Sequence, residues 1–330
     1  MHGFGKAGVA AGVLLLAGLA SLFSPLPIAA AATPLIKLVN PFIGTASGGN
    51  TFPGATLPNG MAQLCPDMSP KRVNGGACYV YNLHHIDGFS MTHLSGTGCT
   101  NYGDVFFTAT TGPVKTRASQ YHFLYSHKNE TALPGYYQVF EKTWGVNAQL
   151  TTTLRCGMAR FTFPAGKAAN IIVPISHVMT SQSYPCHLQF VDHRLLTGYV
   201  TSDVFCSAWP PLPVYFAMQF SKVPNQLGMW KGGKITPGQI VANMKTQRPA
   251  IGAFVSYAAS SQPQTIEVRV GISFVSVKGA MRNLKGEMQS WNFDRYRNTA
   301  EAIWNKALSV IKVSGGSQNH RVNFYTAPYH

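Results

Sequence analysis

The feature that most restricts the fold of this chain is a repeated alternation of apolar and polar residues. In "TIEVRVGISFV", residues 265–275, every second position from Ile266 to Ile272 is apolar and β-branched. The charged residues Glu267 and Arg269 occupy positions between them. A period of two is the pattern of a half-buried antiparallel strand, because successive side chains of a strand point to opposite faces. The sequence therefore predicts a strand here with one face in a core.

The same character recurs along most of the chain. Further apolar runs of strand type occupy 146–154 ("VNAQLTTTL"), 159–163, 170–175, 214–220 and 252–257. Clusters of Gly, Pro, Asn and Ser separate these runs and mark turns. Many short strands with frequent turns predict a mainly β chain, an antiparallel β-sandwich that we place at 33–278. Strands do not alternate with helices as they would in a dinucleotide-binding fold.

The pattern changes toward the C-terminus, where apolar residues recur every three or four positions. Ala280, Leu284 and Met288 lie at four-residue steps in "GAMRNLKGEMQSW". Asn292 and Asp294 are both suited to cap a second helix, because short polar side chains cap helix N-termini. The expected apolar face of that helix consists of Tyr296, Ala300, Ile303, Ala307 and Ile311. These spacings predict a helical linker over 279–313, which the turn "VSGGSQNHR" ends.

The N-terminus has the three parts of a signal peptide. A short positive region with Lys6 precedes an apolar run at 7–23, and "AAAA" at 29–32 supplies small residues for cleavage after Ala32. The alternative is a membrane anchor, but the run contains glycines and alanines and is short for a span of about 20 strongly apolar residues. We predict a signal peptide at 1–32. The chain is then exported, periplasmic or extracellular, with no stable membrane span after cleavage.

The charge balance is strongly basic. Lysine and arginine number 26 against 11 aspartates and glutamates, which gives a formal charge of +15. Such a balance is compatible with nucleic acid or an anionic surface as a partner. The basic residues are scattered, however, and the densest groups are pairs such as Lys71–Arg72. This distribution predicts no nucleic-acid partner and favours a basic exported protein.

The cysteines permit disulfides without specifying them. The six cysteines are Cys65, Cys78, Cys99, Cys156, Cys186 and Cys206. An even number in an exported chain is typical of bridged proteins, but the sequence does not choose among the possible pairings. No C-x-x-C occurs, which argues against a redox dithiol or a zinc site built on that motif. A full set of bridges and a mixture of bridges with buried thiols both remain open.

The stretch "YNLHHIDGFSMTHLSGTGCTNYGD", residues 81–104, is dense in polar side chains and glycine. Its histidines, with Asp87 and Asp104, are of the types that hold zinc or other divalent ions, but their spacing matches no standard motif. Ser90 or Ser95 beside a histidine would suit a nucleophile, without the G-x-S-x-G turn. "SGTG" would suit a phosphate, without the P-loop lysine. A turn-rich structural loop is favoured. We assign no catalytic or metal-binding residue and leave a metal in this stretch open.

Four blocks of the sequence together resemble one family. They are "NPFIGTASGGNTFPGATLPNGMAQLCPD" (40–67), "GFSMTHLSGTGCTNYGD" (88–104), "VRVGISFVS" (268–276) and "NFYTAPYH" (323–330). The blocks occur in the order of the family and span residues 39–330. The chain thus resembles glycoside hydrolase family 92, whose members are exo-acting, calcium-dependent α-mannosidases.

The resemblance implies an order of domains. Family members have an N-terminal β-sandwich, a helical linker and a C-terminal (α/α)6 barrel, which carries the general acid, the general base and most calcium ligands. The segment that resembles "FYTAPYH" opens the barrel. Residues 314–330 would then be the start of a barrel that is otherwise missing from this sequence. The resemblance therefore implies no catalytic residue in this chain, and Ca2+ that this chain alone does not fully ligate.

The resemblance also implies candidate substrate-binding residues. "TASGGNTFPG", the 45–54 loop, resembles the family loop that reaches toward the terminal mannose subsite. This makes Gly48, Gly49 and Asn50 candidates for contact with sugar. Trp230, in "LGMWKGG", is a candidate for stacking on a sugar face, with a structural loop aromatic as the alternative.

The sequence departs from the family pattern at particular positions. Asn59 stands in a triplet that is usually P-F-G, Met91 stands where His is usual, and Pro328 interrupts a segment that usually has A-L-Y-H. Proline costs about 3 kcal/mol in a helix interior but is tolerated in a first turn. Pro328 therefore limits how a barrel helix can begin there. The 92–98 segment, "THLSGTG", resembles a family segment near the domain interface.

These observations predict the N-terminal, non-catalytic part of an exported, calcium-dependent exo-α-mannosidase that is inactive alone. The expected substrate is an α-mannoside, such as the mannose-rich part of an N-glycan. A separately encoded catalytic barrel is the expected protein partner. The alternative is a stand-alone carbohydrate-binding or scaffold protein without hydrolase activity. A basic adhesin for anionic polymers is a third hypothesis.

Overall fold

The computed structural model describes residues 1–3, 5, 33–46, 48–68, 77–99, 102–177, 179, 185–202, 211–245 and 249–330. The chain divides into two compact units, Met1–Thr33 and Pro34–His330. The predicted signal peptide lies outside the described residues, apart from 1–3 and 5, and so do Cys206 and the pair Lys71–Arg72. All helices and strands assigned in the described part belong to the second unit.

The larger sheet of the second unit has nine antiparallel strands within the described residues, in the order β17-β12-β13-β14-β19-β10-β9-β8-β7. The strands are β7 (Glu130–Leu133), β8 (Tyr136–Glu141), β9 (Val146–Thr152), β10 (Cys156–Phe163), β12 (Cys186–Asp192), β13 (Leu195–Ser202), β14 (Leu212–Phe220), β17 (Val241–Met244) and β19 (Gln264–Ser273). The predicted alternation in β19 is confirmed. Ile266, Val268, Val270 and Ile272 are fully buried, and Glu267 and Arg269 are only partly buried.

A second sheet faces the first. In the described part of the chain it has five strands in the order β16-β15-β18-β11-β5. They are β5 (Thr108–Thr111), β11 (Ala169–Val173), β15 (Gln226–Lys231), β16 (Lys234–Pro237) and β18 (Ile251–Tyr257). Short strands form two small sheets: β1 (Ala55–Thr56), β2 (Gln63–Asp67) and β4 (Gly88–Ser90) in one, and β3 (His85–Ile86) and β6 (Phe123–Leu124) in the other.

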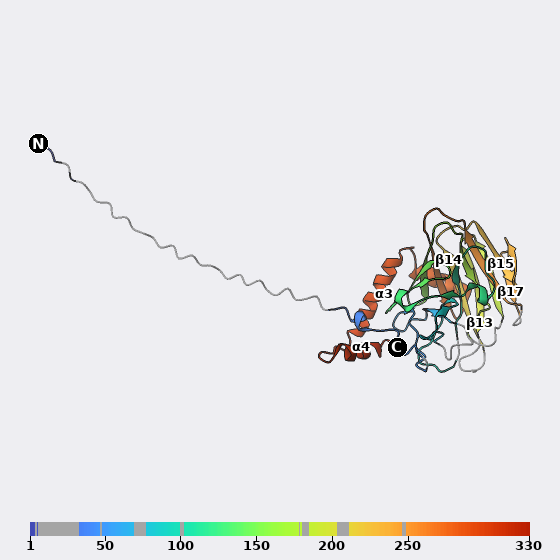
Figure 1. The fold of residues 1–330 in the computed structure, drawn as a ribbon, viewed down its shortest axis with the longest axis horizontal. Coiled ribbons are helices and arrows are strands. Elements are labelled where there is room, and N and C mark those ends of the chain that lie inside the picture. Colours follow the sequence, from blue (N-terminus) through green and yellow to red (C-terminus); the bar gives the residue numbers. More distant parts are fainter. Residues whose placement is uncertain are drawn as a thin grey trace. The chain divides into compact units, whose positions relative to one another are not determined.

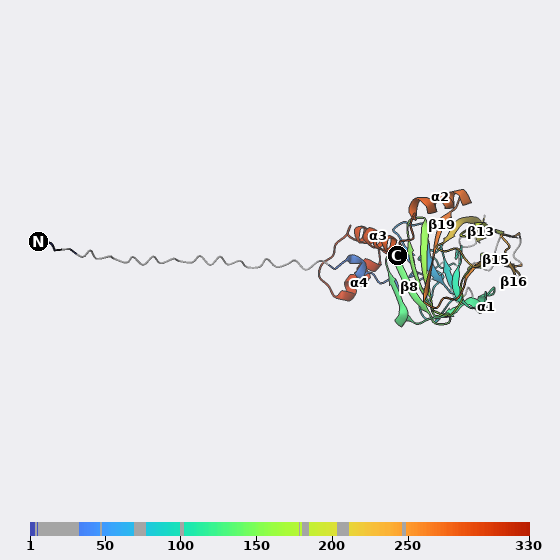
Figure 2. The ribbon, with the colours of Figure 1, turned by 90° about the horizontal axis from the view of Figure 1, so that it is seen from above.

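The main core lies between the two large sheets. Phe161 and Val268 of the nine-stranded sheet and Ile171 and Val255 of the five-stranded sheet belong to one cluster of fully buried side chains. Figures 1 and 2 show the strands of the two sheets in layers. The prediction of a mainly β, antiparallel sandwich is therefore confirmed, because both sheets direct one apolar face inward.

Helices follow the sandwich in the order predicted. α2 (Val277–Glu287) and α3 (Phe293–Leu308) occupy the predicted linker, and short turns form α1 (Ala118–Tyr121), η1 (Leu35–Leu38) and η2 (His127–Asn129). Ala280, Leu284 and Met288 are buried against the outer face of the nine-stranded sheet, as expected from their four-residue steps. The Asn292 side chain accepts a hydrogen bond from the Arg295 N–H over 3.0 Å, so of the two predicted caps Asn292 is the N-cap and Asp294 lies in the first turn.

The predicted apolar face of α3 was partly wrong. Ile303 and Ile311 are 40% and 62% exposed, and Ala307 is exposed as well. The buried stripe instead runs in steps of three and then four residues through Phe293, Tyr296, Ala300, Trp304 and Leu308. The indole of Trp304 explains the difference. The large Trp304 side chain is buried, and its indole N–H donates to the Thr56 carbonyl over 2.7 Å. This bond turns the Trp304 side of the helix toward the core.

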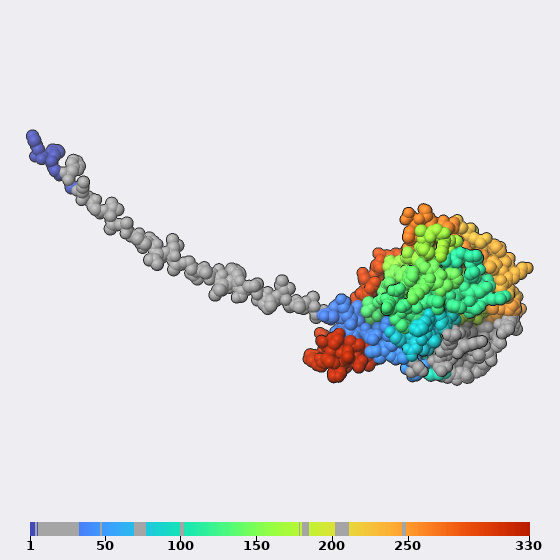
Figure 3. All heavy atoms as spheres, in the orientation of Figure 1, coloured from blue at the N-terminus to red at the C-terminus, as the bar shows by residue number. Residues whose placement is uncertain are grey.

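The C-terminal segment forms α4 (Gln318–Thr326) rather than a strand. Ser317 caps it by accepting from the His320 N–H over 3.2 Å, and the helix ends before Pro328. In Figure 3 the atoms of α4 lie beside those of the η1 segment, and the Asn40 N–H donates to the Thr326 hydroxyl over 3.0 Å. None of the helices in the described part is long and apolar enough to cross a membrane.

The described cysteines show a mixture of bonded and buried sulfur. Cys99 is disulfide-bonded, whereas Cys65, Cys156 and Cys186 are buried thiols. Burial raises the pKa of the Cys186 thiol to about 12. These thiols are therefore protonated at neutral pH and poorly reactive, which corresponds to the mixed arrangement that the sequence left open.

Candidate functional site

The 45–54 loop is held by a tight glycine contact. The Thr51 N–H donates to the Gly44 carbonyl over 3.2 Å. A Cβ atom at Gly49 would overlap that same carbonyl, so only glycine fits there. Gly48 has a φ of +93° and open space beside it. Gly49 is therefore required by the loop itself, whereas Gly48 presents backbone to the surroundings.

Asn50 connects this loop to the 92–98 segment. Its φ is +53°, a left-handed conformation that asparagine adopts more readily than most residues. Its carbonyl accepts a hydrogen bond from the Gly96 N–H over 2.7 Å. Gly48 and Gly49 are exposed, and Asn50 is half-buried. The structure thus places the three predicted loop residues at the surface, next to the other segment that the sequence singled out.

A cleft of about 400 Å³ opens beside the loop. One side is formed by residues between Phe52 and Gln63 together with Leu94 and Ser95. The other side is formed by α3 and residues 328–330. We call this the C-terminal cleft. Among the described residues that line it there is no aspartate or glutamate.

Two aromatic side chains fix the helical side of the C-terminal cleft. The Trp304 indole bonds to the Thr56 carbonyl, and the Tyr329 hydroxyl donates to the Gly54 carbonyl over 3.3 Å. The two rings lie 4.8 Å apart between centroids. Both side chains belong to one buried apolar cluster. Their two hydrogen bonds therefore join the cleft walls from within that cluster.

His330 supplies a polar group to the cleft. Its Nε2 atom is buried and has no hydrogen-bond partner within the part of the chain that the structure describes. Burial lowers the pKa of His330, while a hydrogen bond to the backbone of Ile43 acts in the opposite direction. The imidazole is therefore neutral at neutral pH, and its buried Nε2 atom is not exposed to a ligand in the cleft.

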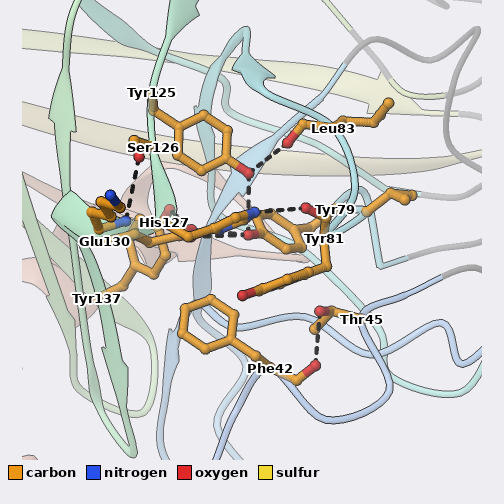
Figure 4. Close-up of polar contacts among 12 residues, drawn as sticks. Phe42, Thr45, Tyr79, Tyr81, Leu83, Tyr125, Ser126, His127, Glu130 and Tyr137 are labelled. Carbon is orange, nitrogen blue, oxygen red and sulfur yellow. Dashed lines mark hydrogen bonds and ion pairs between the residues drawn. The ribbon is translucent and has the colours of Figure 1, made fainter.

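A buried polar network, shown in Figure 4, lies beneath the base of the loop. Its centre is Glu130, at the start of β7, and we call it the Glu130 network. The carboxylate accepts from the Tyr137 hydroxyl over 2.5 Å and from the Tyr79 hydroxyl over 3.0 Å. Its second oxygen lies 2.6 Å from His127 Nδ1. Burial raises the pKa of Glu130, and the hydrogen bonds from Tyr137, His127 and Tyr79 oppose that rise.

The Glu130 network reaches the loop through Tyr81. His127 Nε2 lies 2.8 Å from the Tyr81 carbonyl, and the two rings stack at 3.9 Å. The Tyr81 N–H in turn donates to the Thr45 carbonyl over 3.0 Å, at the first residue of the loop. Phe42 packs edge-on against the Tyr81 ring at 5.7 Å. The buried carboxylate therefore determines the position of the loop base, although it lies far from it in sequence.

Ser90 and His93 do lie together, but not as a nucleophile and base. Ser90 Oγ is 3.4 Å from His93 Nε2, and Asp67 Oδ1 is 2.7 Å from the same nitrogen. In a catalytic triad the serine and the carboxylate bond to opposite nitrogens of the ring. Ser90 is also fully buried, so no substrate reaches it. This geometry removes the nucleophile hypothesis for Ser90.

The ligand group in the described residues does not suit calcium. Asp67, Cys78 and His93 form the group of three potential metal ligands found there, and they offer one oxygen, one sulfur and one nitrogen. Calcium takes six to eight oxygen ligands. These residues therefore do not fit calcium.

Asp87 and Asp104, the carboxylate pair of the 81–104 stretch, are both buried. Asp104 accepts from the Thr92 hydroxyl over 2.9 Å, and the Asp104 N–H donates back to that hydroxyl over 2.9 Å. The reciprocal pair of bonds fixes the start of the 92–98 segment. Asp104 thus has a structural contact of the kind that the sequence favoured.

Trp230 lies in β15 rather than in a loop, and it is 2% exposed. It packs with Phe106, Tyr121 and Phe254 in a separate aromatic cluster. A Cβ atom at Gly252 would overlap the indole ring, so the backbone covers that ring directly. No face of Trp230 is left for a sugar, and the prediction of sugar stacking is not carried further.

Several residues of this site were not anticipated from the sequence. Glu130 and Trp304 come from segments that carry no motif of their own, and Tyr329 and His330 belong to the block "NFYTAPYH", which implied no contact with sugar. A signal for Glu130 did exist, because acids are scarce in this chain and this one begins a short strand. For His330 the block was recognisable, but its position at the cleft was not, since that position depends on the fold of α4 against η1.

The fold and the cleft define the class as a two-sheet sandwich domain joined to a helical region. Residues 38–273 match the Glycosyl hydrolase family 92 N-terminal domain, and residues 279–330 match the Glycosyl hydrolase family 92 catalytic domain. The chain belongs to glycoside hydrolase family 92.

Solved structures and a curated relative agree with this assignment. The family GH92 α-mannosidase BT3965 from Bacteroides thetaiotaomicron is 32% identical, with a TM-score of 0.82 over 90% of this chain and 41% of its own. That enzyme is also known in complex with mannoimidazole. The inverting mannosidase BT2199 from the same organism, at 20% identity and a TM-score of 0.77, covers 90% of this chain and 39% of its own and shares the fold.

A fungal relative from Arthroderma benhamiae, described as an uncharacterized secreted glycosidase, is 25% identical over 89% of this chain and 41% of its own length. The chain therefore spans about two fifths of the length of these relatives. Its match to the catalytic domain is confined to residues 279–330.

Proposed function

We propose that this chain is the N-terminal part of an exported exo-α-mannosidase of family 92 and that it takes part in recognising the terminal mannose. The observation that carries this proposal is the 45–54 loop, which exposes Gly48 and lines the C-terminal cleft through Phe52. The Asn50 carbonyl of this loop is bonded to Gly96, next to the cleft residue Ser95. Exposed backbone and amide groups of this loop suit the hydroxyls of a sugar. The substrate class is an α-mannoside, such as the mannose-rich part of an N-glycan.

We propose further that the chain does not hydrolyse this substrate alone. An inverting glycosidase uses two carboxyl groups about 6.5–9.5 Å apart, one as acid and one as base. The described lining of the C-terminal cleft contains neither. The acid and base would come from a barrel domain, together with Ca2+. Export is supported by the description of the fungal relative as secreted.

An α-mannosidase assay with calcium tests this proposal. The chain alone should release no mannose from an α-linked mannobiose, and adding a family 92 barrel domain should restore release. A matched mixture with the barrel domain alone controls for its own activity. Hydrolysis by the purified chain alone would contradict the proposal.

A stand-alone carbohydrate-binding function is the second candidate. One observation favours it: the C-terminal cleft is closed on both sides by residues of this chain, through Trp304 and Tyr329. Such a protein would bind mannosides with the same affinity whether or not a barrel domain is added. If the chain is instead the N-terminal part of an α-mannosidase, mannosides should bind more tightly when the barrel domain is present.

A further inference from the structure

Three potential metal ligands meet below the 92–98 segment. Asp67 ends β2, Cys78 lies at the start of the next described segment, 77–99, and His93 belongs to the 92–98 segment itself. One ligand atom from each lies within 4.8 Å of the other two, and all three side chains are buried. The backbone holds two of them in place, because the Met68 N–H donates to the Cys78 carbonyl over 2.9 Å.

Both ring nitrogens of His93 face oxygen atoms that can only accept hydrogen bonds. Nδ1 lies 2.7 Å from the Gln63 carbonyl, which only accepts, so Nδ1 carries a hydrogen. Nε2 lies 2.7 Å from Asp67 Oδ1, and a carboxylate oxygen also only accepts. In the neutral ring these two lone pairs would face each other. Either a second proton or a metal ion must therefore lie between Nε2 and Oδ1.

Asp67 has a further unused oxygen. Its side chain is fully buried, and Oδ2 has no hydrogen-bond partner within the described residues. A proton shared between His93 Nε2 and Asp67 Oδ1 would leave Oδ2 without a partner. A metal ion could be bound by both oxygens of the carboxylate, which would satisfy Oδ2 as well. The third residue is held in an unusual backbone state, since Cys78 has a φ of +60°. Strained positions of this kind cluster at ligand sites.

We propose that Asp67, Cys78 and His93 form a buried structural site for a divalent cation of the zinc type. A thiolate, an imidazole nitrogen and a carboxylate oxygen are the donors that zinc prefers, and they do not suit calcium or magnesium. In a tetrahedral site with metal–ligand distances of about 2.0–2.3 Å, neighbouring ligand atoms lie about 3.3–3.6 Å apart. The contact between His93 and Asp67 would open by roughly half an ångström around the ion.

Binding the ion changes protons in a defined way. The thiol of Cys78 releases one proton to solvent and coordinates as the thiolate, and His93 coordinates through Nε2 while Nδ1 stays bonded to the Gln63 carbonyl. The Gln63 carbonyl fixes the ring orientation, as second partners of metal-bound histidines commonly do. Asp67 Oδ2 or a water completes the coordination. The ion would join β2 to the 92–98 segment, and its presence does not depend on sugar binding.

The test uses the full chain, produced in zinc-supplemented medium and dialysed against metal-free buffer. Zinc content is measured by atomic emission, and Co2+ then replaces zinc after chelation, because a cobalt–thiolate bond has a charge-transfer absorption. The variants are Cys78→Ser and Cys78→Gly, and the second suits the positive φ of this position. Cys65→Ser is the matched control, since Cys65 is a buried thiol on the same strand as Asp67 and lies outside the ligand group.

The proposal expects about one zinc per chain in the wild type and in Cys65→Ser. It also expects at least about a tenfold loss of affinity and no cobalt–thiolate absorption in the Cys78 variants. Circular dichroism shows whether each variant is folded, and Cys78→Gly keeps the test valid if Cys78→Ser is not. A folded wild type without zinc would overturn the proposal and leave a proton-linked ion pair. Equal zinc binding in the Cys78 and Cys65 variants would overturn it as well.

Discussion

The space between the two large sheets and the region beneath the 45–54 loop are both buried, but they are held together differently. Between the sheets the contacts are apolar, as for Phe161 and Val268, and neither side chain has a hydrogen bond to satisfy. Beneath the loop, buried Glu130, His93 and Asp104 each bond to partners from other segments. The first region depends on volume, and the second depends on particular atoms.

The largest effect is expected in the apolar region. Phe161 is fully buried against Phe89, Phe107 and Phe163. Phe161→Ala should lower the free energy of unfolding by about 3–5 kcal/mol, because it leaves a cavity between the sheets. Urea unfolding measures this, and Phe161→Leu, which keeps more of the volume, should cost less. Equal losses in the two variants would show that packing volume is not what this region needs.

A buried histidine outside the loop region gives a pH effect. His177 stacks on Phe106, and its Nε2 has no partner within the described residues. Burial lowers the pKa of His177 from 6.5 to about 4, although nearby Asp67 acts to raise it. The unfolded chain then takes up a proton at higher pH than the folded chain. The contribution of His177 to the free energy of unfolding should therefore fall by about 3 kcal/mol as the pH drops from 6.5 to about 4.

Unfolding of wild type and His177→Phe at a series of pH values checks this. The variant has no titrating group at this position, so its loss of stability between pH 6.5 and 4 should be smaller by about 3 kcal/mol. His187→Asn, at a partly exposed strand position, is the control and should behave as the wild type does. Parallel pH curves for wild type and His177→Phe would rule the effect out.

The Glu130 network gives a smaller and more specific effect. Tyr137→Phe removes the 2.5 Å hydrogen bond to Glu130 and should cost about 1.5–3 kcal/mol, because a buried carboxylate loses a donor. Tyr257→Phe is the matched control, since that hydroxyl donates to a neutral carbonyl, of Lys222, over 3.2 Å. The control should cost only about 0.5–1.5 kcal/mol.

Hydrogen exchange adds a local measurement to this pair. Tyr137→Phe should speed exchange of the Tyr81 amide, which bonds to Thr45 at the loop base. Tyr257→Phe should leave that amide unchanged. If both variants speed it equally, the network does not position the loop.

The smallest effect on stability is expected at the exposed apolar residues of the helical region. Val310 and Ile311 are 84% and 62% exposed, although they are apolar. Apolar side chains in this state favour association. Val310→Lys with Ile311→Lys should change the free energy of unfolding by no more than about 0.5 kcal/mol. It should shift the chain toward a monomer in analytical ultracentrifugation, whereas a monomeric wild type would contradict this reading of the surface.

The sequence predicted the apolar region better than the polar one, for physical reasons. In β9 and β19 the burial of alternate residues depends only on the strand period, so a local pattern is sufficient. The face of α3 was harder to predict, because two stripes of the helix were apolar in the sequence. The stripe that contains Trp304 is the buried one, because the Trp304 indole bonds to Thr56, which is distant in the chain.

The candidate site divides in the same way. The 45–54 loop was recognisable from its resemblance to a family loop, and the backbone requirement of its Gly49 is local. The Glu130 network was not, since it joins side chains from separate strands and turns. The same holds for Asp67, Cys78 and His93, which meet only after three segments fold together. For Trp230 the sequence suggested an exposed aromatic ring, whereas the side chain is buried in β15. An aromatic residue among glycines does not show from sequence whether it faces the core or the solvent.

The central claim is that the 45–54 loop and the C-terminal cleft recognise an α-mannoside. Calorimetric titration of the full chain with α-mannobiose tests it most directly, with a galactose disaccharide as the control ligand. Asn50→Gly removes the amide while permitting the positive φ of this position. The account predicts saturable binding of mannobiose that weakens at least about tenfold in Asn50→Gly, as expected for the loss of a ligand hydrogen bond. Absence of saturation at millimolar mannobiose, or equal binding of the galactose disaccharide, would contradict it.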